Sequence, residues 1–310
     1  MKSAVLLLIF NRPSTTSRVF DAIREAQPKT LYVAADGPRK GLDAEHTKVQ
    51  EARRIATAID WDCDLKTLFR DENIGCRDAV TQAIDWFFEN EDSGLIFEDD
   101  CLPSQTFFQF CDEMLNRYQH DKRIWQVSGY NPISSVNSSM AGDYLYSAYG
   151  SIWGWATWRD RWASFKSSLA QHGTSELLNF AIDAIPPDEF PERRRLQLAR
   201  VVHDQRNIWD FQWFFARLIN SGLSVVPQLN QIENIGFGSD ATHTFTSNPS
   251  QQPERHALEF PLVPPPCVLR DRKRDLKLLE QNYAGTDSSL IAKFRRLNSR
   301  FRSKLVFRKW

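Results

Sequence analysis

The chain has 310 residues, 42% of them hydrophobic and 25% charged, proportions typical of a globular protein with room for a sizeable core. Lysine plus arginine and aspartate plus glutamate number 39 each, so the overall charge gives no general attraction to nucleic acid. Five scattered cysteines without a CxxC pair argue against a disulfide framework and a structural zinc site, and favour a cytoplasmic location.

The N-terminal half alternates short apolar runs with helical patterns. The apolar runs predict strands at residues 4–10, 31–35, 65–69, 95–97 and 124–127. Helical spacing predicts a first helix capped by Ser14, a second over 44–58, a third from about 77 to 90, and a fourth that Ser104 opens and that reaches about 118. This alternation is typical of an α/β protein with a Rossmann-like, mainly parallel sheet and helices on both faces.

The pattern changes beyond residue 130. A Ser/Asn-rich loop over 131–142 is followed by aromatic stretches at 144–149 and 153–158, helices to about 200 and over 208–220, and a late strand over 224–226. Three prolines at 264–266 can join neither a helix nor a central strand. We therefore predict one folded unit over 1–265, with halves 1–130 and 131–265, and a linker and tail over 266–310.

Polar side chains stand at the ends of the predicted strands or just beyond them. They are Asn11, Arg12, Asp36, Arg70, Asn73, Arg77, Glu98, Asp99 and Asp100. In parallel α/β sheets ligands bind outside the carboxyl ends of the strands. The sequence therefore predicts that these groups line one crevice.

Three adjacent acids, Glu98, Asp99 and Asp100, directly follow an apolar run. Such a cluster is tolerated where a divalent cation sits among the carboxylates, and Mg²⁺ commonly takes one or two of them plus substrate phosphates. The alternative is an acidic loop or helix cap. Asp36 could bind a base or ribose or simply form a turn, and Arg70 and Arg77 could hold a phosphate or be solvated. No P-loop and no GxGxxG follows an early strand, which disfavours P-loop NTPases and dinucleotide oxidoreductases.

These segments resemble a known family. An N-terminal strand running into Asn-Arg-Pro, the ADGPR strand end, the Arg-Asp-x-Asn-x-Gly-Cys segment and EDD followed by Cys-Leu-Pro look like nucleotide-sugar glycosyltransferases of the GT-A fold. The EDD form is similar to the N-acetylglucosaminyltransferase I type, and the chain resembles bacterial glycosyltransferases of surface polysaccharide assembly. The resemblance covers roughly residues 4–244 and implies a nucleotide-sugar half over 1–130 and an acceptor half over 131–265.

The resemblance implies roles for individual positions. Asp36 would contact the uracil or ribose of a UDP-sugar, and Asp100 would be the direct ligand of Mn²⁺ or Mg²⁺. Glu98 and Asp99 would hold the ribose, the donor sugar or metal-bound water. The implied nucleotide-binding set is Asn11, Arg12, Asp36, Arg70, Asn73, Arg77, Glu98 and Asp99.

An inverting transferase needs a carboxylate that deprotonates the acceptor hydroxyl. Asp210, flanked by two tryptophans at the expected start of the last long helix, occupies the position where the resembled family has its base. The alternatives are that Asp210 only caps the helix, in which case the enzyme could be retaining, or that Asp204 is the base.

Aromatic and histidine residues of the second half are further candidates. Trp153 and Trp155 could form an apolar platform for an acceptor sugar, or could belong to the core. His243 follows a glycine-containing loop, and the resemblance implies that such a late histidine completes the metal shell or touches the diphosphate. Its alternative is a solvated loop residue.

The C-terminal residues 288–310 carry eight bases and no acid, which leaves the rest of the chain at a formal charge of 0 − 8 = −8. If this tail is helical, five apolar residues form one stripe: Leu290, Phe294, Leu297, Phe301 and Leu305. A basic amphipathic helix is typical of binding to an anionic membrane surface. The alternative is a helix docked on the acidic body, whereas nucleic acid is disfavoured because no nucleic-acid motif is present.

These observations predict a metal-dependent glycosyltransferase of the hexosyl type (EC 2.4). It would move a sugar from a UDP-sugar to a glycan or lipid-linked acceptor in surface polysaccharide or lipopolysaccharide biosynthesis, at the inner face of the cytoplasmic membrane. One alternative is a sugar-1-phosphate nucleotidyltransferase, which would need a glycine-rich, basic loop directly after the first strand. The other is a non-catalytic protein that binds sugars or nucleotides.

Overall fold

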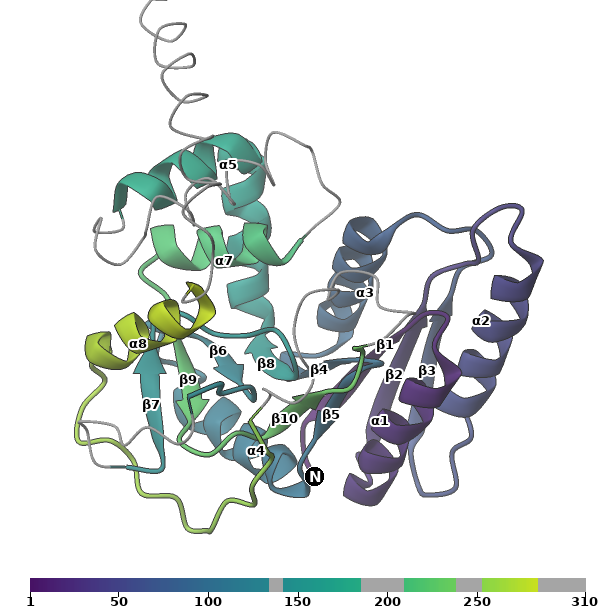
Figure 1. Cartoon of the computed structure of the whole chain (residues 1–310), viewed down its shortest axis with the longest axis horizontal. Coiled ribbons are helices and arrows are strands. Elements are labelled where there is room, and N and C mark those ends of the chain that lie inside the picture. The colour runs from purple at the N-terminus through teal and green to yellow at the C-terminus, as the bar shows by residue number, and fades with distance from the viewer. Residues whose placement is uncertain (134–141, 185–208, 238–252, 284–310) are drawn as a thin grey trace, which may run out of the picture.

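A computed structural model describes residues 1–133, 142–184, 209–237 and 253–283 of the chain (Figure 1). Its centre is an eight-stranded sheet with the order β3-β2-β1-β4-β8-β6-β9-β7. The strands are β1 (Ala4–Ile9), β2 (Thr30–Ala35), β3 (Asp64–Phe69), β4 (Ser93–Glu98), β6 (Ile124–Ser128), β7 (Tyr144–Ser147), β8 (Trp155–Trp158) and β9 (Leu223–Pro227). Two short strands, β5 (Cys101–Pro103) and β10 (Ile232–Asn234), form a separate antiparallel pair.

Helices cover both faces of the sheet, as the sequence predicts. They are α1 (Pro13–Ala26), α2 (Asp43–Ala56), α3 (Cys76–Asn90), α4 (Gln105–Tyr118), α5 (Arg159–Ala184), α7 (Asp210–Ile219) and α8 (Arg272–Tyr283). Alternate residues of a strand point to opposite faces. Val5 and Leu7 of β1 accordingly pack in a core with α1, α2 and α4, whereas Leu6 and Leu8 pack in a second core with α3, α5 and α7.

The sheet is parallel only in part. Strands β3, β2, β1 and β4 are parallel, which confirms the prediction for the first half. Strand β8 lies between β4 and β6 and is antiparallel to both, and β7 is antiparallel to β9. The aromatic stretch of the second half thus supplies a central strand, because Trp155–Trp158 is apolar enough to be buried on both sides.

One local prediction differs from the structure. Ser14 does not cap the first helix, since Arg12 is the N-cap residue and Pro13 occupies the first helical position, where a proline loses no hydrogen bond. The last long helix begins at Asp210, and Ser104 is the N-cap of α4, both as expected.

The packed body extends beyond the three prolines, so the predicted boundary at 265/266 lies too early. The backbone N–H of Asp271 donates to the Tyr146 carbonyl at 2.8 Å, and the buried Asp275 of α8 accepts hydrogen bonds from Ser147 and from the Ala148 N–H. The proposed membrane helix at 288–310 lies outside the described residues. Among the helices that the structure describes, none combines the length and apolarity needed to cross a bilayer.

We predict that Asp275→Ala lowers the free energy of unfolding by about 1–3 kcal/mol, because it leaves buried donors without an acceptor. Asp275 also pairs with Arg270 at 2.5 Å. Chemical denaturation measures the change. Lys273→Ala, at an exposed position of the same helix, is the control and should shift stability by less than about 0.5 kcal/mol. Equal effects of the two substitutions would contradict the anchoring role of Asp275.

Candidate functional site

A cavity of about 300 Å³ lies at the carboxyl ends of β1, β2 and β4, here called the strand-end pocket. The chain passes from β1 to β2 on one side and returns to β4 on the other, so the pocket lies at the topological switch point, where open α/β sheets bind ligands. Its polar lining comprises Asn11, Arg12, Asp36, Arg39, Arg70, Asn73, Cys76, Glu98, Asp99, Asp100 and Asn234. The structure therefore brings together all the predicted strand-end groups except Arg77.

Arg12 binds two of the three adjacent acids. Its guanidinium donates to Asp99 Oδ1 at 2.5 Å and to Asp100 Oδ2 at 2.8 Å. Burial opposes the charge of Arg12, but Asp99 and Asp100 outweigh it and raise the pKa of the guanidinium. The second oxygen of Asp99 accepts the Phe10 N–H at 3.2 Å. Arg12 thus ties the loop after β1 to the end of β4.

Burial and the mutual repulsion of the three acids raise the pKa values of two of them, Glu98 and Asp99. Burial, followed by the charges of Asp100 and Asp99, raises the pKa of Glu98 to about 8. Burial also raises the pKa of Asp99 to about 6, although Arg12 opposes the shift. Gly236 lies against this cluster so closely that a Cβ there would come within 2.2 Å of Asp100 Oδ2.

The donor set fits a divalent cation held by one or two protein ligands. Carboxylate oxygens are the ligands that Mg²⁺ and Mn²⁺ prefer, and a bound cation would offset the burial and mutual repulsion that raise the pKa values of Glu98 and Asp99. Asp99 is engaged on both oxygens, whereas Asp100 Oδ1 receives only the weak donor Cys101 Sγ, at 3.4 Å. Asp100 and Glu98 are therefore the groups that could hold the ion. The described residues contain no group of three or more His, Cys, Asp or Glu side chains that could enclose an ion by themselves.

Asp36 holds the loop before α3 through hydrogen bonds to its backbone. Its carboxylate accepts the backbone N–H groups of Ile74 and Gly75 at 3.1–3.2 Å as well as that of Gly37 at 2.9 Å. Asn73 in turn donates to the Gly37 carbonyl at 2.9 Å. Both residues line the pocket, and the role of Asp36 that these bonds show is to hold the loop that forms one wall.

Three other predicted residues have distinct surroundings. Asn11 donates to Glu45 at 2.9 Å, and Arg70 lines the pocket while donating to Gln82 at 3.2 Å. Arg77 is not among the residues that line the pocket; it lies in the first turn of α3 and pairs with Asp78 at 2.9 Å. The structure therefore gives no support to the nucleotide contact predicted for Arg77.

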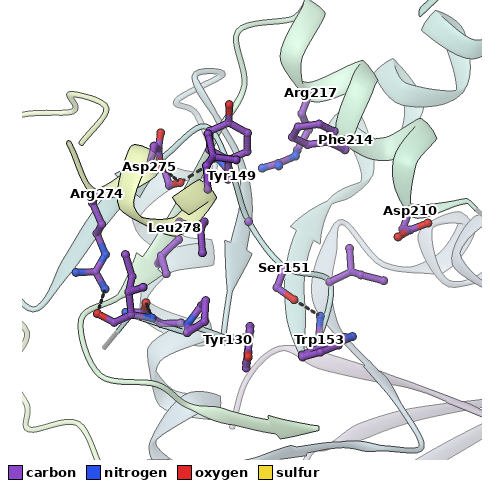
Figure 2. A pocket seen from close by; sticks show the side chains of 18 of the residues that line it. Tyr130, Tyr149, Ser151, Trp153, Asp210, Phe214, Arg217, Arg274, Asp275 and Leu278 are labelled. Carbon is purple, nitrogen blue, oxygen red and sulfur yellow. Dashed lines mark hydrogen bonds between the residues drawn. The ribbon is translucent and has the colours of Figure 1, made fainter. Parts of the chain in front are cut away.

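A second cavity of about 470 Å³ lies between the ends of the central strands, α7 and α8 (Figure 2). We call it the Asp210 pocket. Trp153 lines both cavities, so the two adjoin at this side chain. Trp153 packs edge-on against Tyr130, with 4.7 Å between the ring centroids. Of the residues around this pocket, sequence analysis singled out Asp210 and Trp153 but missed Tyr149, Arg217, Arg274 and Asp275.

Asp210 lines the second pocket at the first turn of α7. The N-cap residue of this helix is Trp209, and Asp210 is the acidic residue of its first turn. The negative charge of Asp210 contributes to the raised pKa of Glu98, after burial, Asp100 and Asp99. Asp210 therefore lies within electrostatic reach of the acids of the strand-end pocket. The rival base Asp204 lies outside the described residues.

The two tryptophans predicted as an acceptor platform have different positions. Trp155 is only 1% exposed, stacks on Trp209 and packs at a tilt against Trp213 within the core, so its prediction as an acceptor contact is wrong. Between Trp153 and Trp155, Gly154 has a φ of +58°, and a Cβ at this position would come within 2.4 Å of Ile232. This turn places Trp153 at the pockets and Trp155 in the core. His243 lies outside the described residues.

Comparison with protein-family models gives no match, and neither does comparison with curated proteins. Among solved structures, a UDP-glucose pyrophosphorylase complexed with UDP-glucose is 9% identical with a TM-score of 0.31, over 54% of this chain and 80% of that chain. The 4-diphosphocytidyl-2C-methyl-D-erythritol synthase from Anaerococcus prevotii is 9% identical with a TM-score of 0.32, over 54% and 77%. An apo UDP-glucose pyrophosphorylase is 7% identical with a TM-score of 0.37, over 76% and 93%. At these scores the functional argument rests on the geometry of the two pockets.

Cys76 provides a probe of the strand-end pocket. Its side chain is exposed along the pocket, but desolvation, and then the charges of Glu98 and Asp210, raise the pKa of the thiol to about 12. Because the thiolate is the reactive form, we predict that alkylation of Cys76 by iodoacetamide rises about tenfold per pH unit from pH 7 to pH 10. Peptide mass spectrometry measures the rate, and Cys76→Ser identifies the peptide. A rate that levels off near pH 9, as for an ordinary thiol, would contradict this assignment.

Proposed function

We propose that the protein is a transferase acting on a nucleotide-sugar, and more narrowly a glycosyltransferase that moves a sugar from a UDP-sugar to a glycan or lipid-linked acceptor. The observation that carries the proposal is the meeting of two pockets at Trp153. One pocket has the acids and the position expected of a donor site, and the other holds a carboxylate, Asp210, within electrostatic reach of the first.

The strand-end pocket is the proposed donor site. Glu98 and Asp100 would hold Mn²⁺ or Mg²⁺, whose chemistry is to neutralise charge on the leaving diphosphate. Arg12 keeps Asp99 and Asp100 in place through its two ion pairs, and Arg70 contributes a further positive charge to the lining.

The Asp210 pocket is the proposed acceptor site, and Trp153 forms the wall that the sugars share. The Asp210 carboxylate would accept the proton of the acceptor hydroxyl while the hydroxyl oxygen bonds to the anomeric carbon. The bond between that carbon and the diphosphate oxygen breaks at the same time, and UDP leaves with the bonding electrons. Direct attack of this kind inverts the anomeric configuration, and a positioned base contributes about 10²–10⁴-fold to its rate.

A sugar-1-phosphate nucleotidyltransferase is the second candidate, since it would share the sheet type and could bind a nucleotide in the same acidic pocket. Against it, only Phe10, Asn11 and Arg12 separate β1 from α1, and no glycine-rich loop is present there to hold a nucleoside triphosphate. The two enzymes release different products, pyrophosphate from UTP or UDP from a UDP-sugar. A non-catalytic protein would bind nucleotide without releasing either.

The setting of the reaction is also a proposal. The basic sequence over 288–310 would attach to the anionic inner surface of the cytoplasmic membrane. Lipid-linked sugars presented there would be the acceptors, in the assembly of surface polysaccharide or lipopolysaccharide.

We predict that Asp210→Asn lowers the rate of UDP release about 10²–10⁴-fold and leaves the affinity for the UDP-sugar within about threefold. The assay follows UDP release from a panel of UDP-sugars with methyl glycosides as acceptors, alongside pyrophosphate release from UTP and sugar 1-phosphates. The control is Asp43→Asn, an exposed carboxylate in the first turn of another helix. Full activity of Asp210→Asn would exclude the proposed base, and pyrophosphate release alone would establish the nucleotidyltransferase.

A further inference from the structure

The Asp210 pocket contains a buried arginine that the proposed transfer does not use. Arg217 lines the pocket and is 1% exposed. It lies seven residues after Asp210 on α7, two turns further along the same face. Figure 2 shows both side chains projecting from this helix, with Phe214 beside Arg217.

The guanidinium of Arg217 is incompletely satisfied. Nη1 donates to Ser224 Oγ, and Nη2 donates to the Ala148 carbonyl at 3.4 Å. Within the described part of the chain, Nε has no hydrogen-bond partner, and no carboxylate forms an ion pair with the side chain.

The nearby carboxylate of Asp275 is committed elsewhere. It accepts Arg270 Nε at 2.5 Å, the Ser147 hydroxyl and the Ala148 N–H. Burial lowers the pKa of Arg217 to about 10, and the charge of Asp275 only partly opposes that effect. Arg217 is therefore still protonated at neutral pH, and its positive charge is buried at the pocket without a paired anion.

A buried charge without a paired anion is unfavourable, and an anion in the pocket would offset this. We propose that the Asp210 pocket binds an acceptor bearing an anionic group, either a carboxylate or a phosphate, which sits at Arg217. The role of this ligand as acceptor rests on the proposed function, whereas the anion site itself does not.

The arrangement also sets the orientation of the ligand. Seven residues of helix correspond to about 10 Å along the axis, so the anionic group and the hydroxyl facing Asp210 lie at different ends of the bound molecule. The reverse orientation would place the anion beside the carboxylate of Asp210. Tyr149 and Phe214, whose rings stack at 5.8 Å, line the pocket near the Arg217 end and offer apolar contact to a sugar ring.

Calorimetric titration of the full chain with pairs of ligands tests the proposal. Methyl β-glucuronide is compared with methyl β-glucoside for the carboxylate, and glucose 6-phosphate with glucose for the phosphate. We expect one of the anionic probes to bind about tenfold or more tightly than its neutral partner, as a charge-assisted hydrogen bond implies. In Arg217→Met the affinity for that probe should fall to the neutral level, with the neutral affinity unchanged.

A second buried arginine provides the control. Arg161 is 3% exposed, donates to backbone carbonyls and lines neither pocket, so Arg161→Met should keep the anion preference. If Arg217→Met does not fold, Arg217→Lys replaces it and should retain part of the preference. Equal affinities for charged and neutral probes in the wild type, or an anion preference that survives in Arg217→Met, would overturn the proposal.

A separate measurement, on Cys76, tests the proposed donor site, so the proposed function and the anion site can fail independently. Protection of Cys76 from maleimide by UDP with Mn²⁺ reports the strand-end pocket. Anion binding without such protection would support the anion site and contradict the proposed function. Protection of Cys76 without an anion preference would support the proposed function and contradict the anion site.

Discussion

The ion pairs of Arg12 with Asp99 and Asp100 are the interaction on which the site depends. Adjacent carboxylates at the end of a buried strand repel one another, and Arg12 holds two of them from the loop after the neighbouring strand. The same pairs join β1 to β4 at the point where the strand order reverses. Glu98 and Asp100 Oδ1 are left available at the pocket, and carboxylate oxygens are the ligands that a divalent cation such as Mg²⁺ prefers.

The second half of the chain builds the Asp210 pocket beside the strand-end pocket. Strand β8 crosses into the sheet beside β4, and the turn at Gly154 that precedes it brings Trp153 to the boundary of the two pockets. Helix α7 carries Asp210 and Arg217 on one face, and α8 closes the far side of the same cavity through Arg274 and Asp275. The strand-end pocket, built at the ends of parallel strands, thus adjoins the Asp210 pocket, whose lining includes the antiparallel pair β7 and β9.

Much of the first half could be predicted from the sequence, because apolar runs and helical spacing are local signals. Strands β1 to β4 and the gathering of polar groups at their ends follow from them. The place of β8 depends on pairing between distant segments, and the separation of Trp153 from Trp155 depends on one positive φ at Gly154. Arg217 was missed because its importance comes from burial, which no local pattern shows. Asp36 was correctly placed at the pocket, but the loop that its carboxylate holds could not be foreseen from a strand-end position alone.

The central claim is that the strand-end pocket binds the metal complex of a nucleotide diphosphate, and thermal melting tests it most directly. Wild type and Asp100→Ala are heated with a panel of nucleotides and UDP-sugars, in Mn²⁺ and in EDTA. A ligand present at 100 times its dissociation constant stabilises the folded state by about 2.7 kcal/mol. We predict that a uridine nucleotide raises the melting temperature of the wild type only with metal, and that Asp100→Ala loses this effect. A response that is absent, or that is indifferent to both metal and Asp100, would contradict the account.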